Sequence, residues 1–275
     1  MDQYAVFGNP IKQSKSPWIH GEFAKQTQQS LHYRAQLVSL EGFEHEVQEF
    51  FSLGGAGLNI TAPFKERAWA MADIRSEGAQ KSGAVNTLYL NSLGQICGDN
   101  TDGRGLLRDL TNNHGANIAN KTVLLLGAGG AIKGVMSALI AQQPASITIA
   151  NRTLDKALAI AKTYADTFAV TASPYEELPS QHYDFIINGT SSGLQGGLPP
   201  IPEGVVSAHT WCYDMIYGQG DTVFQQWAKQ QGAYKALDGL GMLVEQAAES
   251  FKIWRHCEPR TESVIAELRK ILAKD

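Results

Sequence analysis

Residues 122–134 read TVLLLGAGGAIKG, and this stretch predicts the fold of the second half of the chain. An apolar run, Val123 to Leu126, predicts a buried strand that leads into a glycine cluster at residues 127–130. A helix-compatible segment follows it. In dinucleotide folds, such glycines let the backbone approach a pyrophosphate, and the helix N-terminus offers free N–H groups. The third-glycine position of the strict fingerprint holds Ile132, so a glycine turn in another parallel α/β sheet stays open as an alternative.

The residues after the next apolar run, 147–150, predict the phosphorylated cofactor. This run is followed by Asn151, Arg152 and Thr153, where an NAD site usually has an acid that binds the ribose 2′-hydroxyl. A guanidinium instead binds a 2′-phosphate, which a carboxylate would repel. Asp155 is either a first-turn acid that complements the helix dipole or a residue that faces the ribose and allows some use of NAD. We predict NADP.

The bulk composition is typical of an enzyme with two domains. The chain has 275 residues and a net charge of −4, which argues against a nucleic-acid partner. Its 7 histidines show no spacing suited to a metal, and its 3 scattered cysteines are typical of free thiols in a reducing compartment. Residues 1–3 lack the basic start of a signal peptide, and no apolar run approaches membrane-spanning length. We therefore expect a cytoplasmic protein with no metal and no membrane contact.

Alternating strands and helices are also predicted before the glycine turn. Ser16 is expected as the N-cap, and Pro17 as the first residue, of a helix that runs to Gln26. Strands are expected at 4–7, 31–37, 57–61, 85–90, 95–97, 184–187 and 211–213, and helices at 43–51, 64–72, 154–166, 222–231, 243–254 and 261–273. We predict an α/β fold of two domains with a cleft between them. Residues 1–102, completed by helices in 240–275, would bind substrate, and residues 103–239 would form a Rossmann-type NADP-binding domain.

Polar clusters lie at the strand ends of the first domain, three of them after a strand and AVNT at the start of one, and open α/β sheets bind ligands at strand ends. They are SKS at 14–16, NITAPFK at 59–65, AVNT at 84–87 and DNTDG at 99–103. Their hydroxyls, amide, lysine and aspartate suit a small, polyhydroxylated, anionic ligand.

These clusters, in this order, resemble the shikimate dehydrogenase family, which reduces 3-dehydroshikimate with NADPH in aromatic-amino-acid biosynthesis. The glycine loop GAGGA, the NRT segment, YDMIY at 213–217 and DGLGMLVEQAA at 238–248 extend the resemblance over nearly the whole chain. The resemblance implies a small-molecule substrate and a monomer or homodimer. Two departures from the family pattern are Glu245, where a small residue is more common, and Gly189, where Ala is common.

The resemblance also implies roles for individual residues. Lys65 and Asp102 would be catalytic. The substrate would be bound by Ser14, Ser16, Thr61, Asn86, Tyr217 and Gln246. The cofactor would be bound by Glu77, Gly127, Ala128, Gly129, Gly130, Ala131, Asn151, Arg152, Thr153, Met215 and Gly239. Lys156 is added to this set by its position one turn after Thr153, not by the resemblance.

Elementary chemistry agrees with the two catalytic assignments. Reducing a ketone places negative charge on its oxygen, so a cation or acid beside that oxygen is favoured. Lys65 would donate the proton in reduction and accept it in oxidation, and Asp102 would orient the ammonium and bind a substrate hydroxyl. Taken locally, Lys65 is also an ordinary lysine in the first turn of a helix, where the helix dipole opposes a cation. Asp102 is likewise a common turn-former before Gly103.

Three other functions compete with this one. The segment from Gly189 to Gly193 fits the G-x-S-x-G motif of serine hydrolases, with Ser191 as nucleophile and Asp214 and His256 as partners. That motif needs a helix directly after the serine, and the sequence that follows, rich in Gly and Pro, predicts a loop. A relative that prefers quinate or uses NAD and a non-catalytic ligand sensor are the other two. The presence of both Lys65 and Asp102 argues against the sensor.

Overall fold

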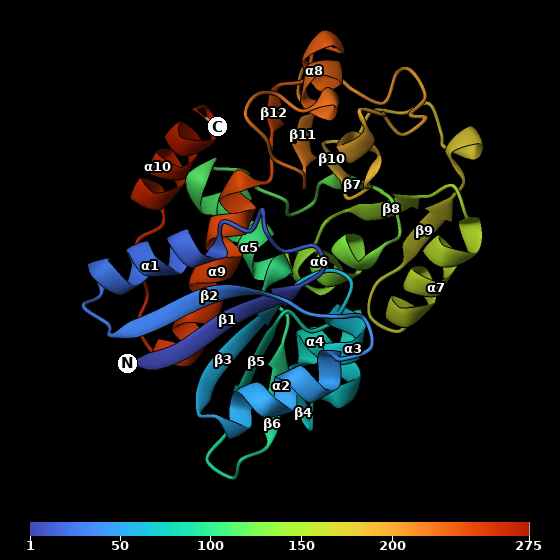
Figure 1. Ribbon diagram of the computed structural model, residues 1–275. Coiled ribbons are helices and arrows are strands. Elements are labelled where there is room, and N and C mark those ends of the chain that lie inside the picture. The colour runs from blue at the N-terminus through green and yellow to red at the C-terminus, as the bar shows by residue number, and fades with distance from the viewer. Residues whose placement is uncertain (275) are drawn as a thin grey trace. The chain divides into compact units, whose positions relative to one another are not determined.

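The computed structural model describes residues 1–274, apart from the side chains of Leu194 and Gln195, and the chain forms two compact units (Figure 1). Unit 1 comprises Met1–Gly105 and Leu243–Ile265, and unit 2 comprises Leu106–Met242 with the chain from Ala266 onward. The boundaries differ from those expected, since residues 103–105 belong to unit 1 and the C-terminal segment belongs to unit 2. The reason for the second difference is a contact within unit 2, where Arg269 forms an ion pair with the buried Asp238.

Unit 1 contains a six-stranded mixed sheet. Its strand order is β2-β1-β3-β5-β6-β4, and β1 pairs in parallel with both β2 and β3, whereas β5 is antiparallel to β3 and β6. The strands are β1 (Asp2–Gly8), β2 (Leu31–Leu37), β3 (Gly55–Ile60), β4 (Ile74–Arg75), β5 (Thr87–Leu90) and β6 (Ile96–Asp99).

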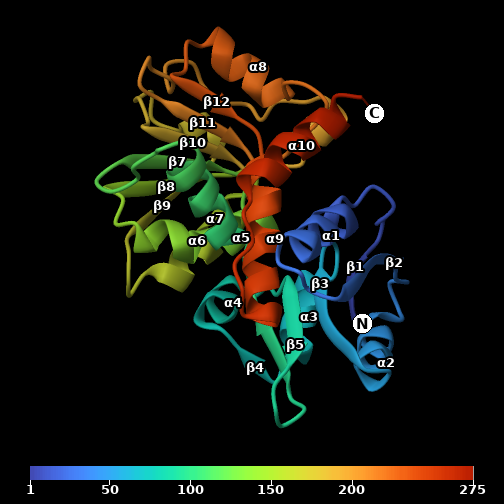
Figure 2. The same cartoon turned by 90° about the vertical axis from the view of Figure 1, so that its left-hand side faces the viewer.

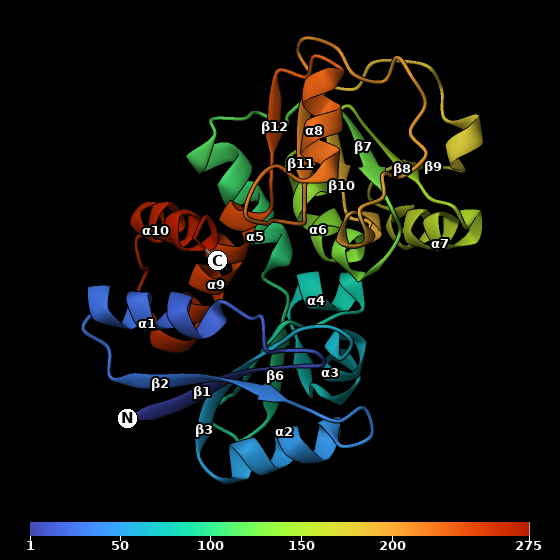
Figure 3. The ribbon, with the colours of Figure 1, turned by 45° about the horizontal axis from the view of Figure 1, so that its top comes forward.

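Side-chain alternation along β1 explains why helices cover both faces of this sheet. Ala5 and Phe7 join an apolar cluster with α2, whereas Tyr4 and Val6 join Tyr33 and Trp254 on the opposite face. Figure 3 shows α1 and α2 on opposite sides of β1 and β2. The helices with residues in this unit are α1 (Ser16–Gln26), α2 (Phe43–Ser52), α3 (Lys65–Met71), α4 (Glu77–Ser82), α5 (Asp102–Arg108), α9 (Leu240–Arg255) and α10 (Glu262–Leu272).

The start of α1 differs from the prediction. Ser16 is the first helical residue, and the cap position is held by Lys15, whose side chain makes no capping hydrogen bond. The Ser14 hydroxyl instead accepts from the backbone N–H of Ser16 at 3.3 Å. Ser16 is therefore not the N-cap, and an upstream serine takes over part of that task.

Unit 2 contains a six-stranded parallel sheet in the order β12-β11-β10-β7-β8-β9 (Figure 2). Counted from β7, this is the doubly wound order 3-2-1-4-5-6 of dinucleotide-binding folds, with the switch point between β7 and β10. The strands are β7 (Thr122–Leu126), β8 (Ser146–Ala150), β9 (Val170–Ser173), β10 (Phe185–Asn188), β11 (Trp211–Asp214) and β12 (Lys235–Leu237).

Helices cover both faces of this sheet as well, as a buried parallel sheet requires. Val123 and Leu125 face a cluster with residues of α6 and α7, whereas Leu124 and Leu126 face α8. The elements are α6 (Gly130–Ala141), α7 (Leu154–Tyr164), α8 (Val223–Gln230), the π-helical turn η1 (Asp109–Asn113) and the 3-10 turns η2 (Tyr175–Glu177) and η3 (Ser192–Gln195). Among the helices of the described chain, none is long and apolar enough to cross a membrane.

Candidate active site

Lys65 and Asp102 form an ion pair in unit 1. Lys65 begins α3 and Asp102 begins α5, each shortly after a strand of the sheet ends. The Lys65 ammonium donates to Oδ2 of Asp102 at 2.6 Å. The Lys65 side chain is 27% exposed and that of Asp102 is 8% exposed. The Lys65 side chain is therefore partly accessible, while the side chain of Asp102, which orients its ammonium, is almost fully buried.

Asn86 and Gln246 complete this cluster. Nδ2 of Asn86 donates to Oδ1 of Asp102 at 2.8 Å and to the Thr101 hydroxyl at 2.9 Å. Oε1 of Gln246 accepts from Asn86 at 3.3 Å and from Thr101 at 3.4 Å. The structure thus brings together Lys65, Asp102, Asn86 and Gln246, which are more than 180 residues apart at the extremes of the sequence.

A deeper polar layer lies under this cluster and received no role in the sequence analysis. Ser250 accepts from Nδ2 of Asn59 at 3.0 Å and lies 2.7 Å from the Thr87 hydroxyl and 3.3 Å from that of Thr101. Tyr33 donates to Oδ1 of Asn59 at 2.7 Å. Ser250 lies four residues after Gln246 on α9, so helical spacing alone places both on one face.

Three of the predicted substrate-binding residues lie near the start of α1, where Ser14 and Ser16 are expected to bind a carboxylate, and after β3, where Thr61 lies. Ser16 is buried and Ser14 is partly buried. Burial raises the pKa of Tyr33, and a hydrogen bond from the Ser16 side chain opposes this rise only in part. Thr61 is partly buried and packs on Gly8, where an added Cβ would lie 2.4 Å from Cγ2 of Thr61. All three residues belong to unit 1.

The glycine turn of unit 2 follows β7. Gly127 has φ +100, a left-handed conformation that favours glycine. A Cβ added at Gly129 or Gly130 would meet no atom within 4 Å. Gly129 is the N-cap of α6 and, being a glycine, has no side chain that could bond to the first N–H groups of the helix. The backbone here is thus open to an anionic group at a helix N-terminus. Ala128 is buried and Ala131 is partly buried.

Ile132 explains one departure from the family pattern. Its side chain is fully buried, and a Cβ added at Gly189 would lie 2.6 Å from its Cδ1. The larger residue at the third-glycine position therefore fits with the smaller residue after β10.

Arg152 and Thr153 are exposed at the end of β8. Thr153 is the N-cap of α7 but makes no capping hydrogen bond with its side chain, and Asn151 donates to the Thr153 carbonyl at 2.8 Å. Burial raises the pKa of Tyr175 to about 12, and the nearby Arg152 charge opposes the rise. Asp155 and Lys156 are exposed in the first turn of α7. A guanidinium and a hydroxyl therefore remain available at a helix N-terminus.

The remaining predicted residues are distributed over both units. In unit 2, a Cβ added at Gly239 would lie 2.4 Å from the carbonyl oxygen of Met215, so Gly239 permits a close backbone approach. Burial raises the pKa of Tyr217, and the charge of Asp238 adds to the rise. In unit 1, Glu77 is exposed and forms an ion pair with Lys81 at 2.7 Å.

The arrangement around Ser191 does not support a hydrolase. Ser191 precedes only the short turn η3 instead of an α-helix. Asp214 accepts from Asn188 at 3.0 Å and from Thr222 at 2.6 Å, so its carboxylate is engaged within unit 2.

Comparison with known proteins identifies the family. Three family models match: the shikimate dehydrogenase substrate binding domain at residues 6–88, shikimate / quinate 5-dehydrogenase at 109–195, and the shikimate 5′-dehydrogenase C-terminal domain at 239–269. The chain belongs to the shikimate dehydrogenase family. It is 53% identical over 268 residues to shikimate dehydrogenase (NADP(+)) of Alkalilimnicola ehrlichii, with 98% of each chain covered. Its identity to the Vibrio cholerae protein of the same name is also 53%, covering 99% of this chain and 97% of that one.

The solved structure of shikimate dehydrogenase from Aquifex aeolicus aligns with a TM-score of 0.85 and 32% identity, covering 98% of this chain and 97% of that one. The Ael1 enzyme from Pseudomonas putida aligns with a TM-score of 0.92 and 46% identity, covering 98% of both chains. The predicted family and the two-domain α/β fold with a Rossmann-like sheet are therefore confirmed. The hydrolase alternative is not supported.

Proposed function

We propose that this chain catalyses the reversible NADP-dependent interconversion of shikimate and 3-dehydroshikimate, a step of aromatic-amino-acid biosynthesis. The observation that carries the proposal is the Lys65–Asp102 pair at 2.6 Å, in which the Lys65 side chain is partly exposed and the Asp102 side chain is buried. Relatives named shikimate dehydrogenase (NADP(+)) that are 53% identical over nearly the full chain support the same activity.

The two proposed catalytic residues have distinct tasks. Lys65 acts as the proton donor to the ketone oxygen in reduction and as the acceptor in oxidation. Its positive charge also stabilises the alkoxide-like oxygen of the transition state. Asp102 holds the ammonium in place through Oδ2, while Asn86 fixes Oδ1. The carboxylate therefore has one oxygen for each partner, and its orientation is set by both.

The proposed substrate site lies around this pair. Ser14 and Ser16 bind the substrate carboxylate, and Asn86 and Gln246 bind its ring hydroxyls beside Asp102. Thr61 and Tyr217 are the remaining proposed contacts. Hydroxyl and amide groups suit this task because they match a polyhydroxylated ring by hydrogen bonding.

NADP fits the residues that unit 2 presents at the end of β7 and β8. The open glycine turn at 127–131 suits the pyrophosphate, and Arg152 with Thr153 suits the 2′-phosphate. Asn151 and Lys156 flank that phosphate, and Met215 and Gly239 lie on the nicotinamide side; Glu77 is retained as a further proposed contact. When bound, NADPH supplies the hydride. A cytoplasmic location and a monomeric or homodimeric state remain predictions from the sequence.

The test is oxidation of shikimate and of quinate, each with NADP and with NAD, followed by absorbance of the reduced cofactor. We expect shikimate with NADP to be the preferred pair. Lys65→Ala should lower kcat about 10²–10⁴-fold, the usual contribution of a positioned acid–base group. NADP affinity should hardly change in this variant.

Lys25→Ala is the matched control, because Lys25 is also in unit 1 but lies in the last turn of α1, where its exposed side chain forms an ion pair with Glu22 of the same helix. It should retain wild-type turnover. Near-normal turnover of Lys65→Ala would remove Lys65 from the mechanism. Equal or better use of quinate would assign the chain to the quinate-preferring alternative.

A further inference from the structure

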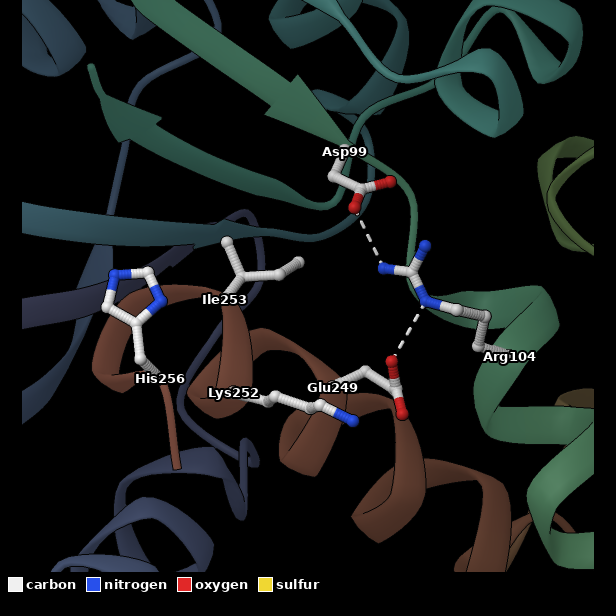
Figure 4. A pocket seen from close by; sticks show the side chains of 6 residues that line it. All are labelled: Asp99, Arg104, Glu249, Lys252, Ile253 and His256. Carbon is white, nitrogen blue, oxygen red and sulfur yellow. Dashed lines mark hydrogen bonds and ion pairs between the residues drawn. The ribbon is translucent and has the colours of Figure 1, made fainter. Parts of the chain in front are cut away.

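Arg104 lies between two carboxylates beside the proposed active site. Its Nη2 donates to Oδ2 of Asp99 at 2.8 Å, and its Nε lies 3.0 Å from Oε2 of Glu249 (Figure 4). Among the described residues, Nε of Arg104 has no hydrogen-bond partner of good geometry, so the second contact is an ion pair rather than a well-directed hydrogen bond. The side chains of Asp99 and Glu249 are only 14% and 13% exposed.

Asp99 is held firmly in its charged form. Burial raises the pKa of Asp99, but hydrogen bonds from Arg104, Ser76 and the Asn100 amide outweigh burial, so the pKa lies below its usual range. The Ser76 hydroxyl donates at 2.5 Å and the Asn100 N–H at 2.7 Å. The end of β6 thus provides a fixed anchor for the guanidinium.

The two partners of Arg104 lie on the segments that carry Asp102 and Gln246. Asp99 ends β6, three residues before Asp102, and Arg104 itself is two residues after Asp102 in α5. Glu249 is three residues after Gln246 in α9, on the same face of that helix. A Cβ added at Gly105 would lie 2.7 Å from the backbone nitrogen of Gln246. The two helices therefore meet in backbone contact next to the ion pairs.

We infer that Arg104 is a positioning residue that holds the Asp102 carboxylate and the Gln246 amide at their working separation. Without the guanidinium, the two carboxylates lose the cation they share, and repulsion between Asp99 and Glu249 favours separation of the end of β6, which leads into α5, from α9. Asp102 and Gln246 lie within one turn of the residues that move. The inference rests on the proposed function, because it gives Asp102 and Gln246 roles in catalysis and substrate binding.

A neighbouring lysine provides the control. Arg104, Asp99 and Glu249 line an open pocket of about 570 Å³ together with Lys252, Ile253 and His256 (Figure 4). Lys252 forms an ion pair with Glu258 at 3.2 Å, and both side chains are about half exposed. Its removal takes the same charge from the same pocket without touching the contact between α5 and α9.

The experiment compares kcat and KM of Arg104→Ala, Arg104→Lys and Lys252→Ala, with melting temperature and the folded fraction measured for each. Arg104→Ala should lower kcat/KM for shikimate about tenfold, since small misplacements of catalytic groups have large effects on rate. KM for NADP should stay unchanged. Arg104→Lys keeps the positive charge but lacks the planar guanidinium that contacts both carboxylates, so its kcat/KM should lie between those of the wild type and Arg104→Ala. Lys252→Ala should match the wild type.

A second measurement tests whether Arg104 acts through Asp102. In an Asp102→Asn background, Arg104→Ala should cost less than about twofold, because the group that it positions is already impaired. A wild-type kcat/KM for Arg104→Ala, an equal loss in Lys252→Ala, or full additivity with Asp102→Asn would each overturn the inference. If Asp102→Asn itself keeps wild-type turnover, the proposed site is wrong, and this inference fails with it.

Discussion

His20 provides a direct link between burial and the pH dependence of stability. It is fully buried in α1, and its ring stacks on Tyr33 with centroids 4.2 Å apart and an interplanar angle of 8°. Phe23, Phe251 and Trp254 surround it. Burial lowers the pKa of His20 to about 3. The nearby Asn59 side chain opposes this lowering of the pKa only in part. In the described part of the chain, neither ring nitrogen of His20 has a hydrogen-bond partner of good geometry.

The sign of the effect follows from proton linkage. The pKa of His20 is about 3 in the folded state and 6.5 for the ordinary side chain, so the unfolded chain takes up the proton first as the pH falls. The stabilising effect is complete above pH ~6.5 and is lost progressively toward pH ~3. Between pH 8 and pH 5 the free energy of unfolding should fall by about 2 kcal/mol through this residue alone.

The substitution His20→Phe should remove this component of the pH dependence. Phenylalanine keeps an aromatic ring for stacking and has no proton to bind. At pH 8 the substitution has two opposing effects on the free energy of unfolding: it removes two buried ring nitrogens that lack hydrogen bonds, and it places a larger ring in a packed core. The pH dependence of stability is therefore the quantity to compare. Urea unfolding curves at pH 8, 6.5 and 5, followed by tryptophan fluorescence, should show the wild type losing about 2 kcal/mol more than His20→Phe.

Proton NMR of the histidine ring gives an independent check. The ring signal that disappears in His20→Phe should not titrate between pH 8 and pH 5 in the wild type. A signal that titrates near pH 6.5, or equal losses of unfolding free energy in the two proteins, would show that His20 is not buried in its neutral form.

Three further predictions concern unit 2. Arg152→Ala should reduce the preference for NADP over NAD by about tenfold or more in kcat/KM, because a charge-assisted pair with the 2′-phosphate is lost; an unchanged preference would contradict the assignment. Gly189→Ala should destabilise the protein by about 1–3 kcal/mol, since its Cβ would clash with Ile132, and the loss should shrink when melting temperatures are compared in an Ile132→Ala background. Gly239→Ala should displace the Met215 backbone and raise KM for NADP about tenfold. An unchanged KM for NADP would show that Met215 does not contact the cofactor.

The strongly patterned parts of the fold could be predicted from the sequence, and the weakly patterned parts could not. The apolar runs of β7 and β8 are each followed directly by glycine or polar residues. Their positions, and their order relative to the glycine turn, could therefore be predicted from the sequence pattern alone. By contrast, β4, β9 and β12 have 2, 4 and 3 residues and were not predicted. β4 and β12 are too short to show a period, and β9, although as long as the predicted β10, reads VTAS and lacks a continuous apolar run.

The site shows the same division. Lys65 and Asp102 stand out because they follow strand ends in polar clusters, and Asn86 because it directly precedes β5 in such a cluster. Ser250 does not stand out, because serines are common in amphipathic helices and need no functional role there. Only the structure shows that its hydroxyl accepts a hydrogen bond from Asn59. Arg104 also gave no signal, since its two partners are 5 and 145 positions away and only one of them is near in sequence.

The hydrogen bonds of Asn86 explain why an amide suits this position better than a carboxylate. Its Oδ1 accepts from the Thr101 N–H at 2.9 Å and from the Thr87 hydroxyl at 2.9 Å, so the amide is fixed with its nitrogen toward Asp102. That nitrogen donates to Oδ1 of Asp102, which directs Oδ2 to Lys65. An aspartate at residue 86 would place like charges side by side. An ammonium has three donor hydrogens, and Asp102 uses one, so Lys65 retains hydrogen-bonding capacity for an oxygen that gains negative charge. The contacts of Asn86 with Thr101 and Thr87 therefore determine the orientation of Lys65, the proposed proton donor, through Asp102.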